Sequence, residues 1–273
     1  MKRFPRWSEN GEVKIVAKLA LVLLSASAWS TLVLRAMQIA TPPPPVAGGD
    51  STASHSPATS HRGVKVAIAW LSDIRGEVQL APSTGREFHP ASVHIPMTSG
   101  NIIQTAMGRA EVEFEDNSSV RLGPYSSVEF SRLELLPSGL TASNVHVLKG
   151  TVYASLIPAY IVHTKGNDCQ LIFGQQHLHL QPSSHVRLEL DATEGRLAVL
   201  DGTGRVDGPF GSIELVKKRT FTFSFAGESQ PAVVKKVVAN PMDAWDRSAV
   251  ALHQNNAKLG RPGRRLFEQS LSP

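Results

Sequence analysis

Apolar and polar residues alternate along most of the chain between residues 62 and 225. Short segments such as "AEVEF", "VRLEL" and "TFTFSF" place an apolar side chain at every second position. This period is typical of a β-strand with one buried face. Turn-forming residues separate the segments at intervals of about ten residues. No strand–helix–strand unit and no Gly-rich phosphate loop interrupts the alternation. The pattern therefore predicts an all-β fold, an antiparallel, hairpin-rich β-sandwich or β-roll.

The pattern is different before residue 41. An uncharged, mostly apolar run extends from Leu19 to Leu34, and with its flanks it reaches the length of a membrane-spanning helix. We predict a signal anchor, one transmembrane helix over residues 15–40, with the short basic segment 1–14 in the cytoplasm. A signal peptide cleaved after Ala28 is the alternative, although the apolar character continues beyond that position. Under either interpretation, the rest of the chain is exported.

Changes in composition set the expected domain boundaries. Residues 41–63 are rich in Pro, Ser and Thr, which predicts a flexible linker. Residues 64–157 are expected to form one β domain, and residues 158–238 a second β segment packed on it. We expect residues 240–259 to form a C-terminal amphipathic helix. We expect residues 260–273 to form a disordered basic tail.

The C-terminal helix has recognisable start and stop signals. We expect Asn240 to be its N-cap and Pro241 to occupy its first position, while Gly260 ends it. Its apolar residues share one side, which should dock on the β domain or on a partner. These residues are Met242, Trp245, Ala249 and Leu252.

The segment "AEVEFEDNSSVRL" raises the question of an acidic active site, because four carboxylates lie between Glu111 and Asp116. A three-residue loop ending at Asn117 keeps the apolar residues of both strands on one face and puts Glu111 opposite Arg121. Asn117 then occupies the left-handed position of the loop. Because the glutamates, Glu113 among them, alternate with apolar residues, we interpret them as the solvated stripe of an antiparallel sheet. We therefore expect no catalytic residues, and not an enzyme.

Charge and cysteine content exclude two classes of function. The net charge of +5 comes from the two ends of the chain, and the middle is slightly acidic. Nucleic acid is therefore not an expected partner, because phosphate binding needs basic residues on the folded surface. The single cysteine, Cys169, excludes a Cys-rich zinc or iron–sulfur site. The basic tail with Arg261, Arg264 and Arg265 leaves electrostatic docking on anionic lipid or wall polymer open.

The segment "HLHLQPSSH" supports an alternative function, a metal-binding β-barrel or metalloenzyme. His177 and His179 share a strand face, His185 lies nearby, and Glu189 is the nearest carboxylate. Two histidines with a carboxylate form an open metal site in some barrels. However, Leu178 takes the inward face, so a half-buried strand turns the first two histidines toward solvent. We expect no cofactor.

Several motifs resemble the FecR-type domain over residues 72 to about 225. The segments "SDIRGEVQL", "MTSGNIIQTAMGRAEVEFEDNSSVRLGPYSSVEF" and "VLKGTVYASL" carry the resemblance. The structural turn and signature positions are Gly76, Gly100, Thr105, Asp116, Asn117, Ser118 and Gly150. Asn101 stands where the family usually has Asp, and Asn117 where it usually has Gly; turns tolerate both residues.

The resemblance implies an exported, all-β regulatory or ligand-sensing module without catalytic residues. The best-known members lie in the periplasm behind one membrane helix and pass a signal to a cytoplasmic sigma factor, through a cytoplasmic region longer than segment 1–14. We therefore expect a single-pass protein of a bacterial inner membrane with its ectodomain in the periplasm, or an exported protein after signal cleavage. Its expected partner is an envelope protein or a cell-wall or envelope polymer.

Overall fold

The computed structural model describes residues 68–158, 166–225 and 230–261. The expected N-terminal segment 1–14, the membrane helix 15–40, the linker 41–63 and all but the start of the tail lie outside these residues. Within the described ranges, no helix is long and apolar enough to cross a membrane.

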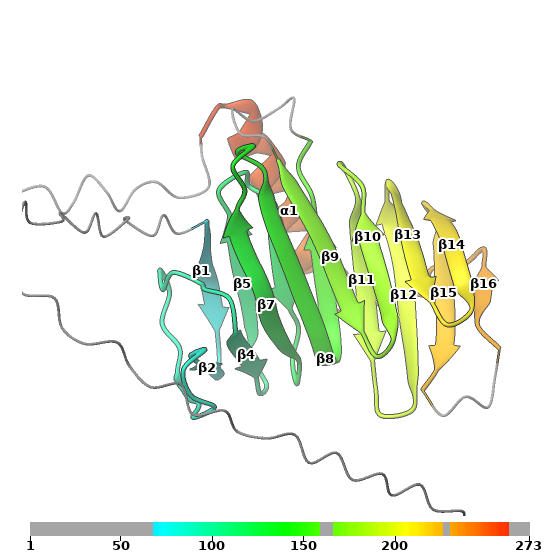
Figure 1. The fold of residues 1–273 in the computed structure, drawn as a ribbon, viewed down its shortest axis with the longest axis horizontal. Helices are drawn as coiled ribbons and strands as arrows, with labels where there is room; N and C mark the ends of the chain where they lie inside the picture. The colour runs from blue at the N-terminus through cyan, green and yellow to red at the C-terminus, as the bar shows by residue number, and fades with distance from the viewer. Residues whose placement is uncertain (1–67, 159–165, 226–229, 262–273) are drawn as a thin grey trace, which may run out of the picture. The chain divides into compact units, whose positions relative to one another are not determined.

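The described residues form two β-sheets that face each other, and one helix (Figure 1). The first sheet contains, in spatial order, β1 (Ala69–Arg75), β5 (Arg109–Phe114), β6 (Ser119–Leu122), the second half of β8 (Thr141–Ser155), β11 (His185–Leu190), β12 (Glu194–Asp201), β15 (Arg219–Ser224) and β16 (Ala232–Val234). The second sheet contains β3 (His89–Pro90), β2 (Val78–Ala81), β4 (Asn101–Thr105), β7 (Ser127–Leu135), the first half of β8, β9 (Asn167–Phe173), β10 (Gln176–Leu180), β13 (Thr203–Gly208) and β14 (Gly211–Val216).

Strand β8 belongs to both sheets. Its residues up to Lys149 pair with β7 and β9 in the second sheet, and those from Gly150 onward pair with β6 and β11 in the first. The chain changes sheets at Gly150, where φ is +89°, a value that side chains disfavour. A Cβ at this position would overlap the Cα and Oγ of Ser126. The glycine therefore allows one long strand to join the two layers.

Alternate residues of both sheets fill the space between them. In the first sheet, β5 supplies Ala110, Val112 and Phe114. In the second sheet, β4 and β7 supply Ile103, Val128 and Phe130. The alternation seen in the sequence therefore marks the inner face of each sheet, as expected for a sandwich. The boundary expected between residues 157 and 158 divides neither sheet, because β9 and β11 continue them by pairing with β8.

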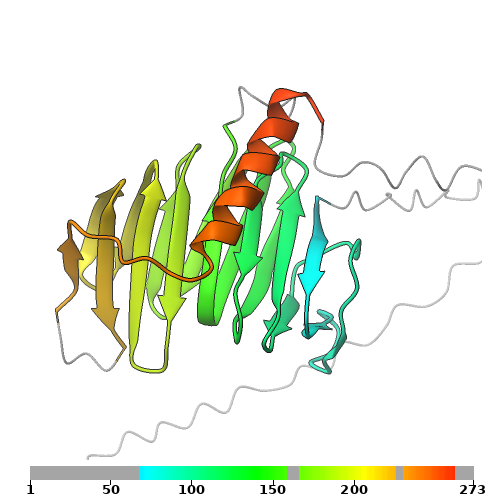
Figure 2. The same ribbon diagram turned by 180° about the vertical axis from the view of Figure 1, so that it is seen from behind.

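Helix α1 (Asp243–Lys258) lies across the outer face of the first sheet (Figure 2). The prediction that Asn240 is its N-cap is wrong: the cap position is Met242, and a turn over residues 240–243 precedes the helix. Asn240 still supports that turn, since its Oδ1 accepts a hydrogen bond from the Met242 N–H. The predicted end at Gly260 is confirmed. Gly260 has φ +64°, and its N–H and that of Arg261 bond the last turn as in a Schellman motif.

The prediction of a mostly β fold with one C-terminal helix is confirmed. The strands pair antiparallel as predicted except at one place, because β9 runs parallel to β8. The prediction that Leu252 lies on the docking face of the helix is wrong, because this residue is 58% exposed. The face that docks on the sheet instead buries Asp246, His253 and Ala257. The docking face is therefore largely ionic, which the apolar pattern did not indicate.

Candidate functional site

The hairpin of β5 and β6 has the register that the sequence predicted. Ala110 pairs with Leu122, Glu111 with Arg121, and Val112 with Val120. Asn117 has φ +63° and closes a loop in which the Asn117 N–H donates to the Phe114 carbonyl. The three-residue loop and its left-handed asparagine are thus confirmed.

The interpretation of Glu111 and Glu113 as a solvated stripe is wrong, because each is only 7% exposed. Both point to the outer face of the first sheet, as predicted, but α1 covers that face. His253 of the helix lies between them, with its Nε2 3.1 Å from Glu111 Oε1 and its Nδ1 3.3 Å from Glu113 Oε1. The carboxylates are therefore helix-docking groups.

Arg121 and Asp246 form the centre of the helix–sheet contact, and neither side chain has any exposed surface. Arg121 Nε donates to Asp246 Oδ1 at 2.9 Å. Its other nitrogens donate to the hydroxyls of Ser119 and Ser155. His185 of β11 approaches the second oxygen of the same aspartate, with 2.7 Å between Nε2 and Oδ2. The pair is thus held by two serines and a histidine from three strands.

A second arginine binds the start of the helix. Arg187 of β11 donates to Asp243 Oδ1 at 2.6 Å and to the Val238 carbonyl at 2.5 Å, and its Nε lies 3.3 Å from Glu189 Oε2. Tyr153 donates to the same Asp243 oxygen at 2.8 Å. We name the set of Glu111, Glu113, Arg121, Tyr153, His185, Arg187, Asp243, Asp246 and His253 the ionic layer.

The charges of the ionic layer shift its pKa values. Burial alone lowers the pKa of His253, but the adjacent Glu111 and Glu113 outweigh it and raise that pKa from 6.5 to about 9. Burial raises the pKa of Glu111, yet His253 and Arg121 bring it below its usual value. Burial also raises the pKa of Asp243, and the hydrogen bonds from the Asn240 N–H, Arg187 and Tyr153 reverse that shift. These groups are therefore charged near neutral pH and hold one another.

The ionic layer fixes the helix on the sheet. Its central pair has no exposed surface, so a substrate has no access to it. The sequence did carry a weak signal for the layer. Asp246 and His253 lie seven residues apart on α1, a spacing that puts two polar residues on one helix face.

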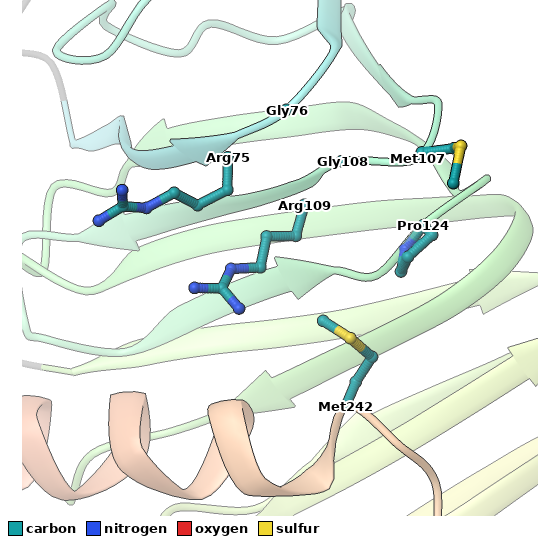
Figure 3. A pocket seen from close by; sticks show the side chains of 7 residues that line it. All are labelled: Arg75, Gly76, Met107, Gly108, Arg109, Pro124 and Met242. Carbon is teal, nitrogen blue, oxygen red and sulfur yellow. The ribbon is translucent and has the colours of Figure 1, made fainter.

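An open pocket lies beside the start of α1, where β1 ends and β5 begins (Figure 3). It encloses about 450 Å³ and is lined by Arg75, Gly76, Met107, Gly108, Arg109, Pro124 and Met242. Arg75 and Arg109 are direct cross-strand partners, and Figure 3 shows their side chains running side by side in the same direction. We name this site the arginine pocket.

Among the residues that the structure describes, the two arginines of the pocket have few anionic partners. Arg75 Nε lies 3.7 Å from Asp73 Oδ1 in an exposed pair, and such pairs contribute little. The Arg109 guanidinium lies over the Trp245 ring, 4.7 Å from its centroid. Its Nε is buried and, among the described residues, makes no hydrogen bond. The pocket therefore has positive charge available for a ligand.

Large exposed side chains flank the arginine pocket. Met107 is 81% exposed and Tyr125 is 60% exposed. Their loops are joined, because the Tyr125 N–H donates to the Ala106 carbonyl at 2.7 Å. Arginine, methionine and tyrosine are enriched in protein interfaces. The rim of the pocket therefore combines arginine with exposed methionine and tyrosine.

The structure does not gather the three histidines considered as metal ligands. His177 and His179 lie on β10 in the second sheet, whereas His185 lies on β11 in the first. His179 contacts Gln170 and Asp207, at 3.0 and 3.3 Å from its Nε2. In the described part of the chain, no group of three or more potential ligands is placed to hold a metal ion.

The signature positions lie at turns and close contacts. Gly76 and Gly100 have φ values of +74° and +86°. Thr105 donates to the Gly123 carbonyl at 2.7 Å and accepts from the Ser126 N–H. Asp116 accepts hydrogen bonds from the N–H and hydroxyl of Ser118, while burial raises its pKa to about 6. Each of these residues therefore lies in a turn or forms hydrogen bonds with one.

The chain matches no family model and no curated protein. Among solved structures, two crystal structures of "a putative anti-sigma factor" from Parabacteroides distasonis are similar to it, with a TM-score of 0.41 each. The first shares 10% sequence identity over 60% of this chain and 74% of its own. The second shares 11% identity over 57% of this chain and 73% of its own.

Proposed function

We propose that the chain is a tethered recognition module of the bacterial envelope, without catalytic activity, that binds an acidic segment of a protein partner in the arginine pocket. Residues 15–40 would hold it in the inner membrane and the β domain would lie in the periplasm. The resemblance of residues 72 to about 225 to the FecR-type domain supports a regulatory or sensing role. The partner is expected to be an envelope protein.

The observation that carries this proposal is the direct pairing of Arg75 with Arg109 across two strands. Like charges opposite each other destabilise a sheet, so an unoccupied pocket keeps an unfavourable contact. A carboxylate between the two guanidinium groups would remove it and could accept bidentate hydrogen bonds. Met107 and Tyr125 on the rim would add apolar contact.

The ionic layer supports the same function indirectly. It fixes the start of α1, and Met242 at that end forms one wall of the arginine pocket. Trp245 of the helix also lies under Arg109. A helix held by buried ion pairs therefore keeps the pocket in one shape, which lowers the conformational cost of binding.

A photo-crosslinking experiment tests the proposal. A photoreactive amino acid replaces the exposed Met107 in the full chain, expressed in its native host. We expect one discrete adduct that protease degrades, as a protein partner requires. Arg75→Glu should abolish the adduct, since it replaces a cation that is 73% exposed with an anion. Arg196→Glu is the matched control, because Arg196 is 52% exposed and lies on β12.

Three results would contradict the proposal. They are no adduct at position 107, an adduct that survives Arg75→Glu, and an adduct with a polymer that protease leaves intact.

A second measurement addresses location. If residues 15–40 form an anchor, the chain fractionates with membranes, and added protease reaches the β domain in spheroplasts but not in intact cells.

A further inference from the structure

A second pocket lies at the other end of the chain's β structure, far from the arginine pocket in the strand order. It encloses about 480 Å³ where the β9–β10 turn, the β13–β14 turn and the end of β15 meet. Gln175, Gln176, Phe210, Phe223, Phe225 and Pro231 are among the residues that line it. We name this site the aromatic pocket.

A row of phenylalanine rings leads from the core into the aromatic pocket. Phe173 and Phe221 pack against Phe223 with centroid distances of 5.2 and 5.4 Å. Phe225 stands edge-on to Phe223 at 5.3 Å and is 40% exposed. The rings at the inner end are buried and hold Phe223 in place. The pocket therefore offers a rigid aromatic surface that solvent reaches at Phe225.

Gln176 adds an unused hydrogen-bond acceptor to the aromatic pocket. The residue is 8% exposed, yet its Oε1 has no hydrogen-bond partner within the described part of the chain. Buried polar atoms are normally hydrogen-bonded. A Cβ at Gly174 would lie 3.0 Å from this oxygen and 2.7 Å from the Phe225 ring. The glycine thus lets the Phe225 ring and the Gln176 oxygen pack close to the backbone at the pocket, where a donor on a ligand could bond to this oxygen.

The described residues that line the aromatic pocket carry no charge. They combine aromatic rings and prolines with the amides of Gln175, Gln176 and Gln230. A charged ligand would lose its hydration here without gaining a counter-ion. A neutral ligand needs an apolar face for the rings and hydroxyl or amide groups at its edge. A neutral sugar ring has both, because its C–H groups form one face and its hydroxyls radiate from the rim.

We propose that the aromatic pocket binds a neutral sugar unit of a glycan, with its C–H face on Phe225 and a hydroxyl donating to Gln176 Oε1. The site shares no residue with the arginine pocket. Binding of sugar is therefore independent of the partner proposed above, and Arg75→Glu should leave it unchanged.

Calorimetric titration of the full chain with three neutral oligosaccharides tests the proposal. The probes are cellotetraose, maltotetraose and tetra-N-acetylchitotetraose, each at millimolar concentration, with decaproline as a neutral peptide that also fits aromatic grooves. We expect at least one oligosaccharide to bind saturably. Phe225→Ala and Gln176→Leu should each weaken that binding about tenfold or more. Val216→Ala is the control, since Val216 is 47% exposed and does not line the pocket.

The outcomes separate the alternatives. Saturable sugar binding that both variants weaken, with an unchanged melting temperature for Phe225→Ala, supports the proposal. The absence of saturable binding by all three oligosaccharides overturns it. Sugar binding that neither variant weakens also overturns it, because the sugar then binds elsewhere. Binding of decaproline alone, lost in Phe225→Ala, would assign the pocket to a peptide and overturn the assignment to a glycan.

Discussion

At the residue scale, the ionic layer explains why carboxylates on an outer strand face are buried. Glu111 and Glu113 stand opposite a helix face that presents His253 rather than apolar side chains. A buried charge is tolerated when a partner of opposite charge contacts it. In the ionic layer, the helix and the sheet each supply charged residues that contact residues of opposite charge on the other. Helix α1 therefore docks mainly through ion pairs and hydrogen bonds.

The pKa of His253 predicts how stability depends on pH. This pKa rises from 6.5 to about 9 in the folded state, so the folded chain binds the proton more tightly than the unfolded chain. The stabilisation is fully present below pH 6.5 and is lost as the pH rises toward about 9. A shift of this size corresponds to a loss on the order of 3 kcal/mol.

Urea unfolding across this pH range measures the effect, and His253→Gln is the control. The free energy of unfolding of the parent should fall from pH 6.5 to pH 9 more steeply than that of the variant, which lacks the titrating group. Equal slopes for the two proteins would show that His253 does not carry the dependence. An NMR titration that places the pKa of His253 near 6.5 would show the same.

The Arg121–Asp246 pair predicts a large penalty for removing one partner. Asp246→Ala removes the carboxylate that is hydrogen-bonded to the fully buried Arg121 and leaves it with the more distant Glu111, whose Oε2 lies 3.7 Å from Arg121 Nη1. We therefore expect a loss of about 3–5 kcal/mol in the free energy of unfolding. Glu194→Ala removes one partner of the exposed Arg196 pair and should cost less than about 1 kcal/mol. The double change Arg121→Met with Asp246→Leu should recover much of the loss, because neither of these two positions then buries an unpaired charge. A similar loss for Asp246→Ala and Glu194→Ala in urea unfolding would refute the argument.

The contrast between Asn117 and Glu113 shows what the sequence could predict about the site. The position of Asn117 follows from local rules, because loop length and strand register are set by neighbours in the chain. The environment of Glu113 depends on His253, which is 140 positions away in sequence. Local alternation gave the correct face for the glutamate, but only the fold reveals that a helix covers that face. Arg121 and Asp246 are 125 positions apart, so local alternation predicts the pairing of Arg121 with Glu111 but not its contact with Asp246.

At the element scale, β8 determines how the two layers are joined. The sequence indicated the strand and its glycine but not the change of sheet, since alternation is the same in either layer. Arg75 and Arg109 illustrate a related limit. They belong to strands that are far apart in the chain, and their pairing appears only once β1 lies beside β5.

Gly150→Ala tests the role of the bend in β8. Gly150 and Gly211 have φ values of +89° and +91°, but an added Cβ would overlap Ser126 at the first and meets no atom within 4 Å at the second. Gly211→Ala should therefore lose about 1–2 kcal/mol from backbone strain alone. Gly150→Ala should lose about 1–3 kcal/mol more from overpacking.

Thermal or urea unfolding of the two glycine variants compares these losses. Equal destabilisation would show that the space at Gly150 can relax without cost. A larger loss for Gly211→Ala would contradict the assignment of the bend to Gly150.

At the scale of the whole molecule, both sheets continue without a break across the expected boundary between residues 157 and 158. Strand β8 pairs with β6 and β7, which precede it in the chain, and with β9 and β11, which follow it. Helix α1 then contacts strands from both sides of the division, because Asp246 bonds Arg121 of β6 and approaches His185 of β11. The two β segments therefore share one set of backbone pairs and one ionic layer.

This shared structure predicts that the β region unfolds as a single unit. Calorimetry of the full chain should show one transition for it, with equal calorimetric and van't Hoff enthalpies. A fragment covering residues 64–157 should not fold alone, because β8 would lose both β9 and β11 and the first sheet would lose its helix. Two transitions, or a fragment 64–157 with native-like near-ultraviolet circular dichroism, would contradict this. Such a result would mean that pairing within β1 to β8 is sufficient for folding and that the ionic layer only attaches the second segment.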